Sequence, residues 1–336
     1  WIGVALFLFF LFSVLDLSIL RSRAVLVSMY FAGLAALFLL FVTSDPVRGA
    51  TSWFRFGTLS LEPAEPIKIV LALVLAKYFS RRHIEIANIR HIIVSGLYVL
   101  IPLFLVFIQP DLGSAIILCS LWLAMVLVSG ISKKHFFALS MLAIAVTTAG
   151  WFFVLEPYQR LRIYSFLDPY IDPRGAGYHT IQTQIAVGAG GVWGRGIGYG
   201  SQSRLEFLPE HETDFMFAAF AEEWGFAGSF LLFIFFGIVV WRIVRVGVMG
   251  EGNFERLYAI GLATVIVAQF FVHVGMNVGI LPITGLPFPF LSYGGSSLIT
   301  LFAGLGILNS FSKRPAYSQE AALTPLEAFG SNARKQ

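Results

Sequence analysis

Residues 205–240 read LEFLPEHETDFMFAAFAEEWGFAGSFLLFIFFGIVV, an acid-rich loop that runs directly into an apolar stretch starting at about Phe215. The apolar part is long enough to cross a bilayer, which takes about 20 helical residues. A carboxylate at a membrane surface beside other carboxylates can hold a raised pKa and accept a proton at neutral pH. Asp214 is therefore a candidate general base at the edge of a membrane cavity. The pattern equally allows Thr213 or Asp214 to cap the helix.

The composition predicts an all-α, polytopic membrane protein. Hydrophobic residues make up 57% of the chain and charged residues only 12%, against about 25% charged in soluble domains. A single transmembrane domain is expected over residues 1–312, with long outer loops at about 43–66 and 156–213. The nine predicted spans are Ile2–Leu20, Ala24–Val42, Ile67–Phe79, His91–Ile108, Ser114–Ser129, His135–Leu155, Phe215–Val240, Leu257–Leu281 and Ser296–Phe311.

Basic residues near the span ends predict the orientation, because cytoplasmic loops carry an excess of Lys and Arg. Arg21, Arg81, Lys133, Arg242 and their basic neighbours all fall on one side, which we assign to the cytoplasm. The tail 313–336 is then cytoplasmic and is predicted to be disordered. An odd number of spans, beginning at Trp1, predicts that an earlier helix is missing from this chain.

The outer loops carry arginine but no lysine, against the usual charge bias. Arginine binds phosphate through two parallel hydrogen bonds, so an anionic ligand outside would explain the excess. The alternative is that these arginines pair with carboxylates such as Glu62, Glu156 and Asp168. The residues concerned are Arg48, Arg55, Arg160, Arg162, Arg174, Arg195 and Arg204.

Several polar residues fall at membrane depth, where they are usually functional or paired. Glu65 and Lys68 are spaced to form an ion pair on one helix face, which favours a structural role over catalysis. Glu222 lies eight residues past Asp214, about 12 Å deeper, and is expected to face the same cavity. The remainder are interpreted as contacts between helices, with Asp111 also a candidate cavity carboxylate. These are Asp16, Asp111, Gln269, His273 and Asn277.

Other chemistries find little support. The one cysteine, Cys119, lies inside a span, and the six histidines show no metal-ligand spacing. The glycine-rich stretch Gly188–Gly200 matches no phosphate-binding motif and is predicted to be a close-packed outer loop with tight turns. No nucleotide or nucleic-acid site is expected.

Several motifs together resemble one family. They are Gln109-Pro110-Asp111-Leu112-Gly113-Ser114, Asp168-Pro169, Gly175-Ala176-Gly177-Tyr178-His179, Ile181-Gln182, Gly190-Gly191, Ser201-Gln202-Ser203-Arg204-Leu205-Glu206-Phe207-Leu208-Pro209-Glu210, Gly279-Ile280-Leu281-Pro282, Gly285-Leu286-Pro287 and Leu291-Ser292-Tyr293-Gly294-Gly295-Ser296. In this order they are similar to the SEDS family (shape, elongation, division and sporulation), over essentially the whole chain to about Ser312. Ala176-Gly177-Tyr178-His179 and Leu205-Glu206-Phe207 resemble its RodA branch rather than FtsW, the division counterpart.

The resemblance implies a peptidoglycan glycosyltransferase that polymerises lipid II outside the bacterial cytoplasmic (inner) membrane, for cell elongation and rod shape. The family has ten spans with both ends inside, so this chain would begin at the second of them. A large extracellular loop would then precede the seventh span of this chain. The essential carboxylate of the Thr-Asp-Phe motif falls on Asp214, the Trp of the first outer loop on Trp53, and the following Glu and Lys on Glu65 and Lys68. A class B penicillin-binding protein and other elongation-complex membrane proteins are the implied partners.

The same resemblance marks further candidates for binding lipid II or its pyrophosphate, namely Trp53, Arg160, Arg162, Arg204, His179, Gln182, Ser292 and Tyr293. Asp111, Glu212 and Glu222 are the candidate cavity carboxylates. The departing pyrophosphate must be stabilised, for which either Arg or a divalent cation (Mg or Mn) suffices, so the sequence allows a cation without requiring one.

The chain departs from the family pattern at three positions. Glu212 stands where the family usually has His, Ser52 replaces a basic residue before Trp53, and Ala64 replaces Ser. The extra charge of Glu212 should raise the pKa of Asp214 or favour a bound cation. Two other functions remain open, a lipid II flippase using mid-membrane polar residues and a non-catalytic scaffold for a penicillin-binding protein.

Overall fold

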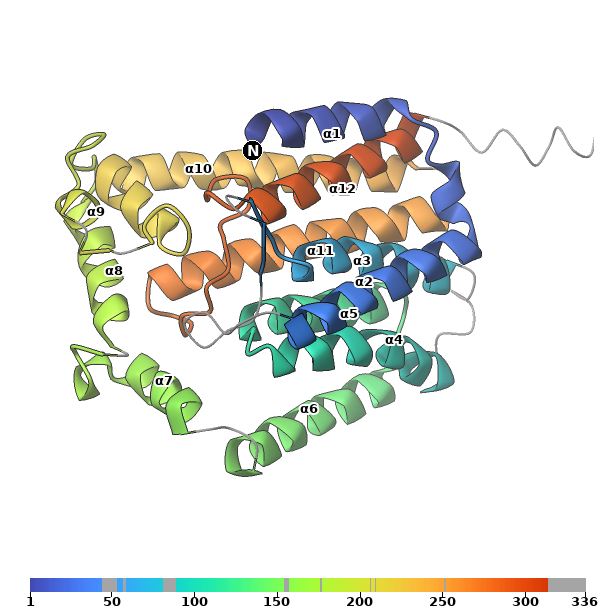
Figure 1. Cartoon of the computed structure of the whole chain (residues 1–336), viewed down its shortest axis with the longest axis horizontal. Coiled ribbons are helices and arrows are strands. Elements are labelled where there is room, and N and C mark those ends of the chain that lie inside the picture. The colour runs from blue at the N-terminus through green and yellow to red at the C-terminus, as the bar shows by residue number, and fades with distance from the viewer. Residues whose placement is uncertain are drawn as a thin grey trace, which may run out of the picture.

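The computed structural model describes residues 1–43, 53–56, 59–80, 89–153, 157–175, 177–205, 207–208, 210–250 and 252–313 as a bundle of roughly aligned helices (Figure 1). The helices are α1 (Ile2–Val14), α2 (Arg23–Thr43), α3 (Ala64–Ser80), α4 (Ile89–Ile108), α5 (Leu112–Val128), α6 (Lys133–Phe153), α7 (Pro157–Leu167), α8 (Tyr178–Ala189), α9 (Ser201–Arg204), α10 (Met216–Met249), α11 (Asn253–Asn277) and α12 (Gly295–Lys313). Two short 3-10 helices are η1 (Ser18–Arg21) and η2 (Pro169–Ile171).

The core of the bundle is α11, which packs against α3, α5, α10 and α12. Apolar side chains from these helices form one continuous cluster, in which Leu71 and Ala72 of α3 and Leu262 and Ile266 of α11 are fully buried. α1 packs on α12, and α2 and α4 close the other side of α3. α3 and α11 are therefore buried on nearly every face, which forces any polar residue on them to find a partner inside the protein.

All nine predicted spans are helical, which confirms a polytopic helical fold. Among the described residues, six helices are long and apolar enough to cross a membrane by length and composition: α2, α4, α6, α10, α11 and α12. α1 and α5 are shorter apolar helices. α3 extends N-terminally past the predicted Ile67 to Ala64, so it gains length on the Glu65 side as expected. The predicted disordered tail beyond Lys313 lies outside the described residues.

Three predicted spans have boundaries that are wrong by four residues or more. The seventh, expected over Phe215–Val240, runs nine residues further as α10, to Met249. The first, expected to reach Leu20, ends at Val14, because Leu15 is extended and the Asp16 carboxylate accepts a hydrogen bond from the Ser18 amide instead of letting the helix continue. The eighth, expected over Leu257–Leu281, runs four residues earlier. It ends at Asn277 because Gly279 adopts a positive φ of 79° and turns the chain.

The two outer loops contain structure that the apolar pattern did not predict. In the first, strands β1 (Phe54–Phe56) and β2 (Leu59–Leu61) form an antiparallel hairpin in which Phe54 pairs with Leu61. The second contains α7, η2, α8 and α9, which line the end of the bundle where α10 begins (Figure 1).

The predicted glycine-rich loop docks into a break in α10. Gly225 has φ 66°, which interrupts the helix and frees backbone groups on both sides. The Arg195 amide donates to the Glu222 carbonyl at 2.9 Å, and the Phe226 and Ala227 amides donate to the carbonyls of Gly191 and Val192 at 2.9 and 3.0 Å. The loop thus supplies the hydrogen bonds that the helix loses, and the expected close-packed loop is confirmed.

α6 differs from its neighbours. None of its residues is buried, and Figure 1 shows α6 and α7 lying apart from α10, α11 and α12. This helix presents almost its whole surface to its surroundings.

Candidate functional site

Asp214 lies in the turn that leads into α10. Its backbone amide donates to the Glu210 carbonyl at 3.1 Å, as do the Thr213 and Phe215 amides at 3.1 and 3.2 Å. Glu210 holds this carbonyl in place with a positive φ of 62°, uncommon for a residue other than glycine. The N-cap position is Phe215 and its side chain makes no capping bond, so neither Thr213 nor Asp214 occupies the cap position that the sequence allowed.

The first turn of α10 is capped from α11. The Phe217 amide donates to His273 Nε2 at 3.3 Å, and His273 Nδ1 lies 2.7 Å from the Leu286 carbonyl. Nδ1 is therefore the protonated nitrogen, since Nε2 must accept. The Ala218 amide donates to Asn277 Oδ1 at 3.2 Å, and Asn277 Nδ2 donates to the Asp214 carbonyl at 3.1 Å. Both residues act as helix–helix contacts, as expected, and Asn277 fixes the backbone of Asp214 directly.

The loop after α11 also holds the Asp214 turn through hydrogen bonds. The Ser292 hydroxyl donates to the Thr213 carbonyl at 2.7 Å, and the Tyr293 amide donates to the Glu212 carbonyl at 2.8 Å. Gly285, at a φ of 74°, passes so close to Asp214 that a Cβ there would lie 3.5 Å from the carboxylate. Ser292 and Tyr293 thus hold the Asp214 turn, and their predicted contact with substrate stays a prediction.

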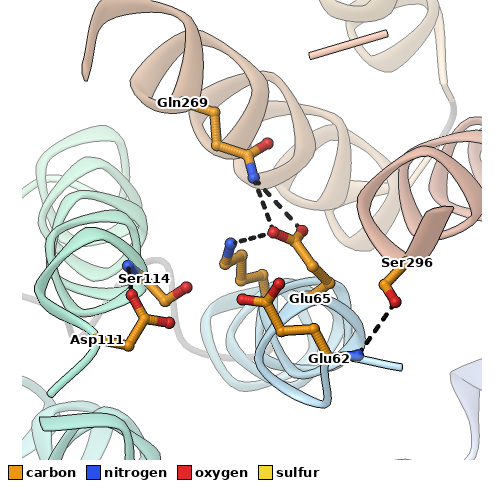
Figure 2. A network of polar contacts seen from close by, with 7 residues as sticks. Glu62, Glu65, Asp111, Ser114, Gln269 and Ser296 are labelled. Carbon is orange, nitrogen blue, oxygen red and sulfur yellow. Dashed lines mark hydrogen bonds and ion pairs between the residues drawn. The ribbon is translucent and has the colours of Figure 1, made fainter. Parts of the chain in front are cut away.

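A buried acid cluster lies on α3 and its neighbours (Figure 2). We use this name for Glu62, Glu65, Lys68, Asp111 and Gln269. Lys68 Nζ binds Glu65 Oε1 at 2.8 Å, with 0% and 1% of the two side chains exposed. Gln269 Nε2 reaches both Glu65 oxygens at 3.4 Å. The Glu65 carboxylate is therefore surrounded by donors from two helices.

The carboxyl groups of the cluster interact with Asp214. Burial raises the pKa of Glu62 well above its ordinary value, and the charges of Glu65 and Asp111 raise it further. Lys68 lowers this pKa, and Asp214 adds to the rise, so Asp214 lies within electrostatic range of the cluster. Burial also raises the pKa of Asp111, although Ser114, whose amide donates to it at 2.9 Å, lowers it.

The cluster also organises the outer loops. The Glu62 amide donates to the Ser296 hydroxyl at 3.0 Å, and this hydroxyl donates to the Ser60 carbonyl of the hairpin at 3.1 Å. Trp53, the predicted substrate contact, precedes that hairpin with 44% of its surface exposed. The side chains of Arg48 and Arg55 lie outside what the structure describes, so the alternative pairing of Glu62 with an outer arginine stays a prediction.

Of the outer-loop candidates, His179 comes closest to the Asp214 turn. Its ring stacks on Phe215 with centroids 5.5 Å apart and an interplanar angle of 23°. Gln182 lies one turn further along α8, partly buried. Glu222 accepts bonds from the Ser201 hydroxyl at 3.2 Å and the Gln202 amide at 3.0 Å, so it anchors α9.

No contact with the Asp214 turn is seen for the arginine candidates whose side chains the structure describes. Arg160 Nη2 donates to the Phe152 carbonyl of α6 at 3.4 Å, and the described contacts of Arg160 do not join it to the Asp214 turn. Arg204 ends α9 and is exposed. The side chain of Arg162, like those of Arg48 and Arg55, lies outside what the structure describes. Phosphate binding by these residues remains a prediction.

The exposed side chain of Glu212 points to solvent on the same turn as Asp214. Within the described ranges, no three His, Cys, Asp or Glu residues converge in a way that could hold a metal ion. Within the cluster, Lys68 offsets the negative charge of Glu65, which it binds at 2.8 Å.

Comparison with known proteins decides the family. A family model described as a cell cycle protein family, FtsW/RodA/SpoVE, matches residues 1–317. The chain belongs to this family. A FtsW/RodA/SpoVE relative is the peptidoglycan glycosyltransferase MrdB of Escherichia coli K12, 39% identical over 263 residues, which are 78% of this chain and 71% of that protein. Stage V sporulation protein E of Bacillus subtilis is 34% identical, over 80% of this chain and 73% of its own.

Solved FtsW/RodA/SpoVE structures share the fold. One is described as the structural coordination of polymerization and crosslinking by a peptidoglycan synthase complex. It has a TM-score of 0.81 at 34% identity, and the match covers 94% of this chain and 88% of that chain. Thermus thermophilus RodA has a TM-score of 0.69 at 28% identity, covering 94% and 86%. The resemblance stated from the motifs is confirmed.

The predicted helix–helix contact of Gln269 is confirmed, but sequence reasoning did not predict that Glu62 and Gln269 belong to the buried acid cluster. Glu62 precedes Glu65 by three residues, a spacing that would have placed both on one side of the start of α3. Gln269 is 204 residues from Glu65 along the chain, and no local pattern pairs them.

Proposed function

We propose that this chain is a peptidoglycan glycosyltransferase that polymerises lipid II into glycan strands at the outer face of the bacterial cytoplasmic membrane. The observation that carries the proposal is the rigid presentation of Asp214. A partly buried carboxylate, fixed through its backbone by Glu210 and Asn277, lies beside the buried acid cluster. Names of relatives support the same activity, since MrdB is a peptidoglycan glycosyltransferase.

Asp214 acts as the general base in this proposal. The carboxylate takes the proton of an acceptor sugar hydroxyl as the hydroxyl oxygen attacks the anomeric carbon of the donor. The bond from that carbon to the pyrophosphate breaks, and undecaprenyl pyrophosphate leaves with the electron pair. Attack opposite the α-linked leaving group inverts the carbon and gives a β-linked glycan. The leaving group is already activated, so no nucleotide is required.

An apolar groove next to the cluster fits the lipid part of the substrate. It has a volume of about 550 Å³ and lies between α1, α2, α3 and α12. Its walls include Phe12, Met29 and Leu73, whereas Glu62 and Ser296 lie at its polar end. A polyprenyl chain in this groove would leave its pyrophosphate near the outer end of α3, beside the Asp214 turn. His179, which stacks on Phe215, and Gln182 on the same helix are candidates for polar contacts there.

A protein partner of this chain is inferred from the comparison with solved structures. A related structure is described as a complex that coordinates polymerization and crosslinking. We infer that this chain likewise works with a class B penicillin-binding protein that cross-links its product, within an elongation complex. The basic residues at the end opposite Asp214 favour a cytoplasmic C-terminus.

The test is glycan polymerisation from purified lipid II by the full chain with its cognate partner, whose transpeptidase is blocked. Wild type is compared with Asp214→Asn and with Glu212→Gln, an exposed carboxylate on the same turn. We expect polymer from wild type and Glu212→Gln and at least a 100-fold loss in Asp214→Asn, in the range that removal of a general base produces.

Two results would overturn the proposal. Equal polymer from wild type and Asp214→Asn would remove Asp214 from the mechanism. Transbilayer movement of lipid II by well-folded protein that makes no polymer would support the flippase alternative. That alternative uses His273, Asn277 and Glu222, which hold backbone groups of α10 and α9 in the structure.

A further inference from the structure

A second cavity lies at the end of the bundle opposite the Asp214 turn. It has a volume of about 330 Å³ and is enclosed by α2, α3 and α4. The residues that line it are Arg23, Leu26, Val27, Tyr30, Phe31, Val74, Lys77, Tyr78 and Tyr98. Two cations and three tyrosines thus share a pocket with aliphatic walls, and no carboxylate is among the described residues that line it.

The position of the cavity is fixed by α11. Lys77 Nζ lies over the ring of Phe254, at the start of α11, 5.6 Å from its centroid. Asn277, at the other end of α11, holds Asp214. The 23 residues between them span about 35 Å of helix, slightly more than the roughly 30 Å hydrocarbon core of a bilayer. The two cations therefore lie at the level of the opposite membrane surface, where lipid headgroups are.

The tyrosines make a rigid wall. The Tyr30 hydroxyl donates to the Tyr98 carbonyl at 2.8 Å, and the Tyr78 hydroxyl lies 3.0 Å from His91 Nδ1. The rings of Tyr30 and Tyr78 pack edge to face against Tyr98, with centroids 6.1 and 5.9 Å away. The pocket is thus shaped before any ligand enters, which reduces the entropy lost on binding.

The rim of the cavity carries positive charge. Arg23 is exposed at the first residue of α2, where the helix dipole adds positive potential. Nearby, the Glu255 carboxylate is bound by Arg21 at 2.8 Å. One and two turns further along α2 from Arg23, Val27 and Phe31 are 45% and 62% exposed, and they would line the path of an acyl chain.

We propose that this cavity binds an anionic phospholipid, with the phosphate between Arg23 and Lys77 and an acyl chain along Val27 and Phe31. Basic pockets between membrane helices bind such headgroups, and each cation near the surface contributes about fivefold in affinity. The continuous apolar wall distinguishes this site from one for a free phosphate, which would need polar groups on all sides.

The test is native mass spectrometry of the full chain in mild detergent, titrated with phosphatidylglycerol or with phosphatidylethanolamine of the same acyl chains. We expect a preference for phosphatidylglycerol. Arg23→Gln, at an exposed position that leaves the fold intact, should weaken it roughly fivefold, and Arg23→Gln with Lys77→Gln roughly 25-fold. Val74→Phe keeps every charge but fills the cavity, and should reduce binding of both lipids.

The matched control is Lys133→Gln with Lys134→Gln, which removes two exposed charges at the start of α6, outside the cavity. It should change affinity less than twofold. The proposal is overturned if the control loses as much as the cavity variant, which would indicate non-specific surface attraction. It is also overturned if Val74→Phe binds like wild type, or if glycerol 3-phosphate competes fully with the lipid, which would indicate a site for a free anion.

Discussion

Two acid-rich regions meet at the Asp214 turn, and they behave differently. In the loop before α10, Glu210 and Glu212 are exposed to solvent, where water screens their charges. In the buried acid cluster, Glu62 and Glu65 have 9% and 1% of their surface exposed. The loop stands out in the sequence, yet the charge interaction with Asp214 that the structure resolves is that of Glu62 in the buried acid cluster. Charge density along a sequence therefore says less about a site than the depth at which each charge lies.

The largest effect is expected from the cluster. Lys68→Met leaves Glu65 without its ion-pair partner in a fully buried position, and should destabilise the protein by about 3–5 kcal/mol. Thermal unfolding of the purified protein in detergent measures this. Adding Glu65→Gln to Lys68→Met should recover most of the loss, because the stranded charge is removed. Unfolding of Lys68→Met at the wild-type temperature would show that the ion pair with Glu65 does not stabilise the folded protein.

The next effect tests whether the loop depends on the interior for its shape. Asn277→Leu leaves the Ala218 amide and the Asp214 carbonyl without their partner, at a cost of about 1–3 kcal/mol. Polymerisation should fall at least tenfold, since the base is displaced. Thr264→Val, on the same helix, removes only a bond to the Ile260 carbonyl one turn away and serves as the control. Unchanged polymerisation by Asn277→Leu would mean that the loop before α10 keeps its conformation without the hydrogen bonds from Asn277.

A smaller effect should appear in the pH dependence of stability. The pKa of Glu62 is raised in the folded protein above its ordinary value of 4.5, so the folded state holds the proton more tightly. Stability from this group is complete below pH 4.5 and is lost as pH rises through the folded pKa. Glu62→Gln, which mimics the protonated form, should flatten the decline in melting temperature between pH 5 and 8 by roughly 2 °C. A steeper decline in the variant would reverse the sign and contradict this assignment.

The smallest effect is expected in the loop itself. Glu212→Gln removes an exposed charge two residues before Asp214 and should change polymerisation less than about twofold, with no change in melting temperature. Activity is measured at low and at high salt, because an exposed charge acts through a screened field. A tenfold loss at both salt concentrations would give Glu212 a direct part in the reaction and remove the contrast between the two regions.

Much of this architecture could be predicted, because apolar runs and basic flanks follow from the bilayer itself. The boundaries that failed depend on single local bonds, such as that between Asp16 and Ser18. The outer helices α7 to α9 were missed because their sequences carry little apolar periodicity. For the site, the i, i+3 spacing predicted the pair of Glu65 and Lys68, whereas the bond from Gln269 to Glu65 depends on packing between distant segments.

The buried bond between Gln269 and Glu65 has a consequence for how the chain is made. At typical rates of translation, the 204 residues that separate them take about 10–40 s to synthesise. During that interval α3 carries a carboxylate and an ammonium that a single helix in lipid accommodates poorly. Lys68 can neutralise Glu65 at once, since both lie on one helix, but the second donor arrives only with α11. The ion pair between Lys68 and Glu65 thus stabilises α3 in the membrane during the interval before the rest of the bundle has been inserted.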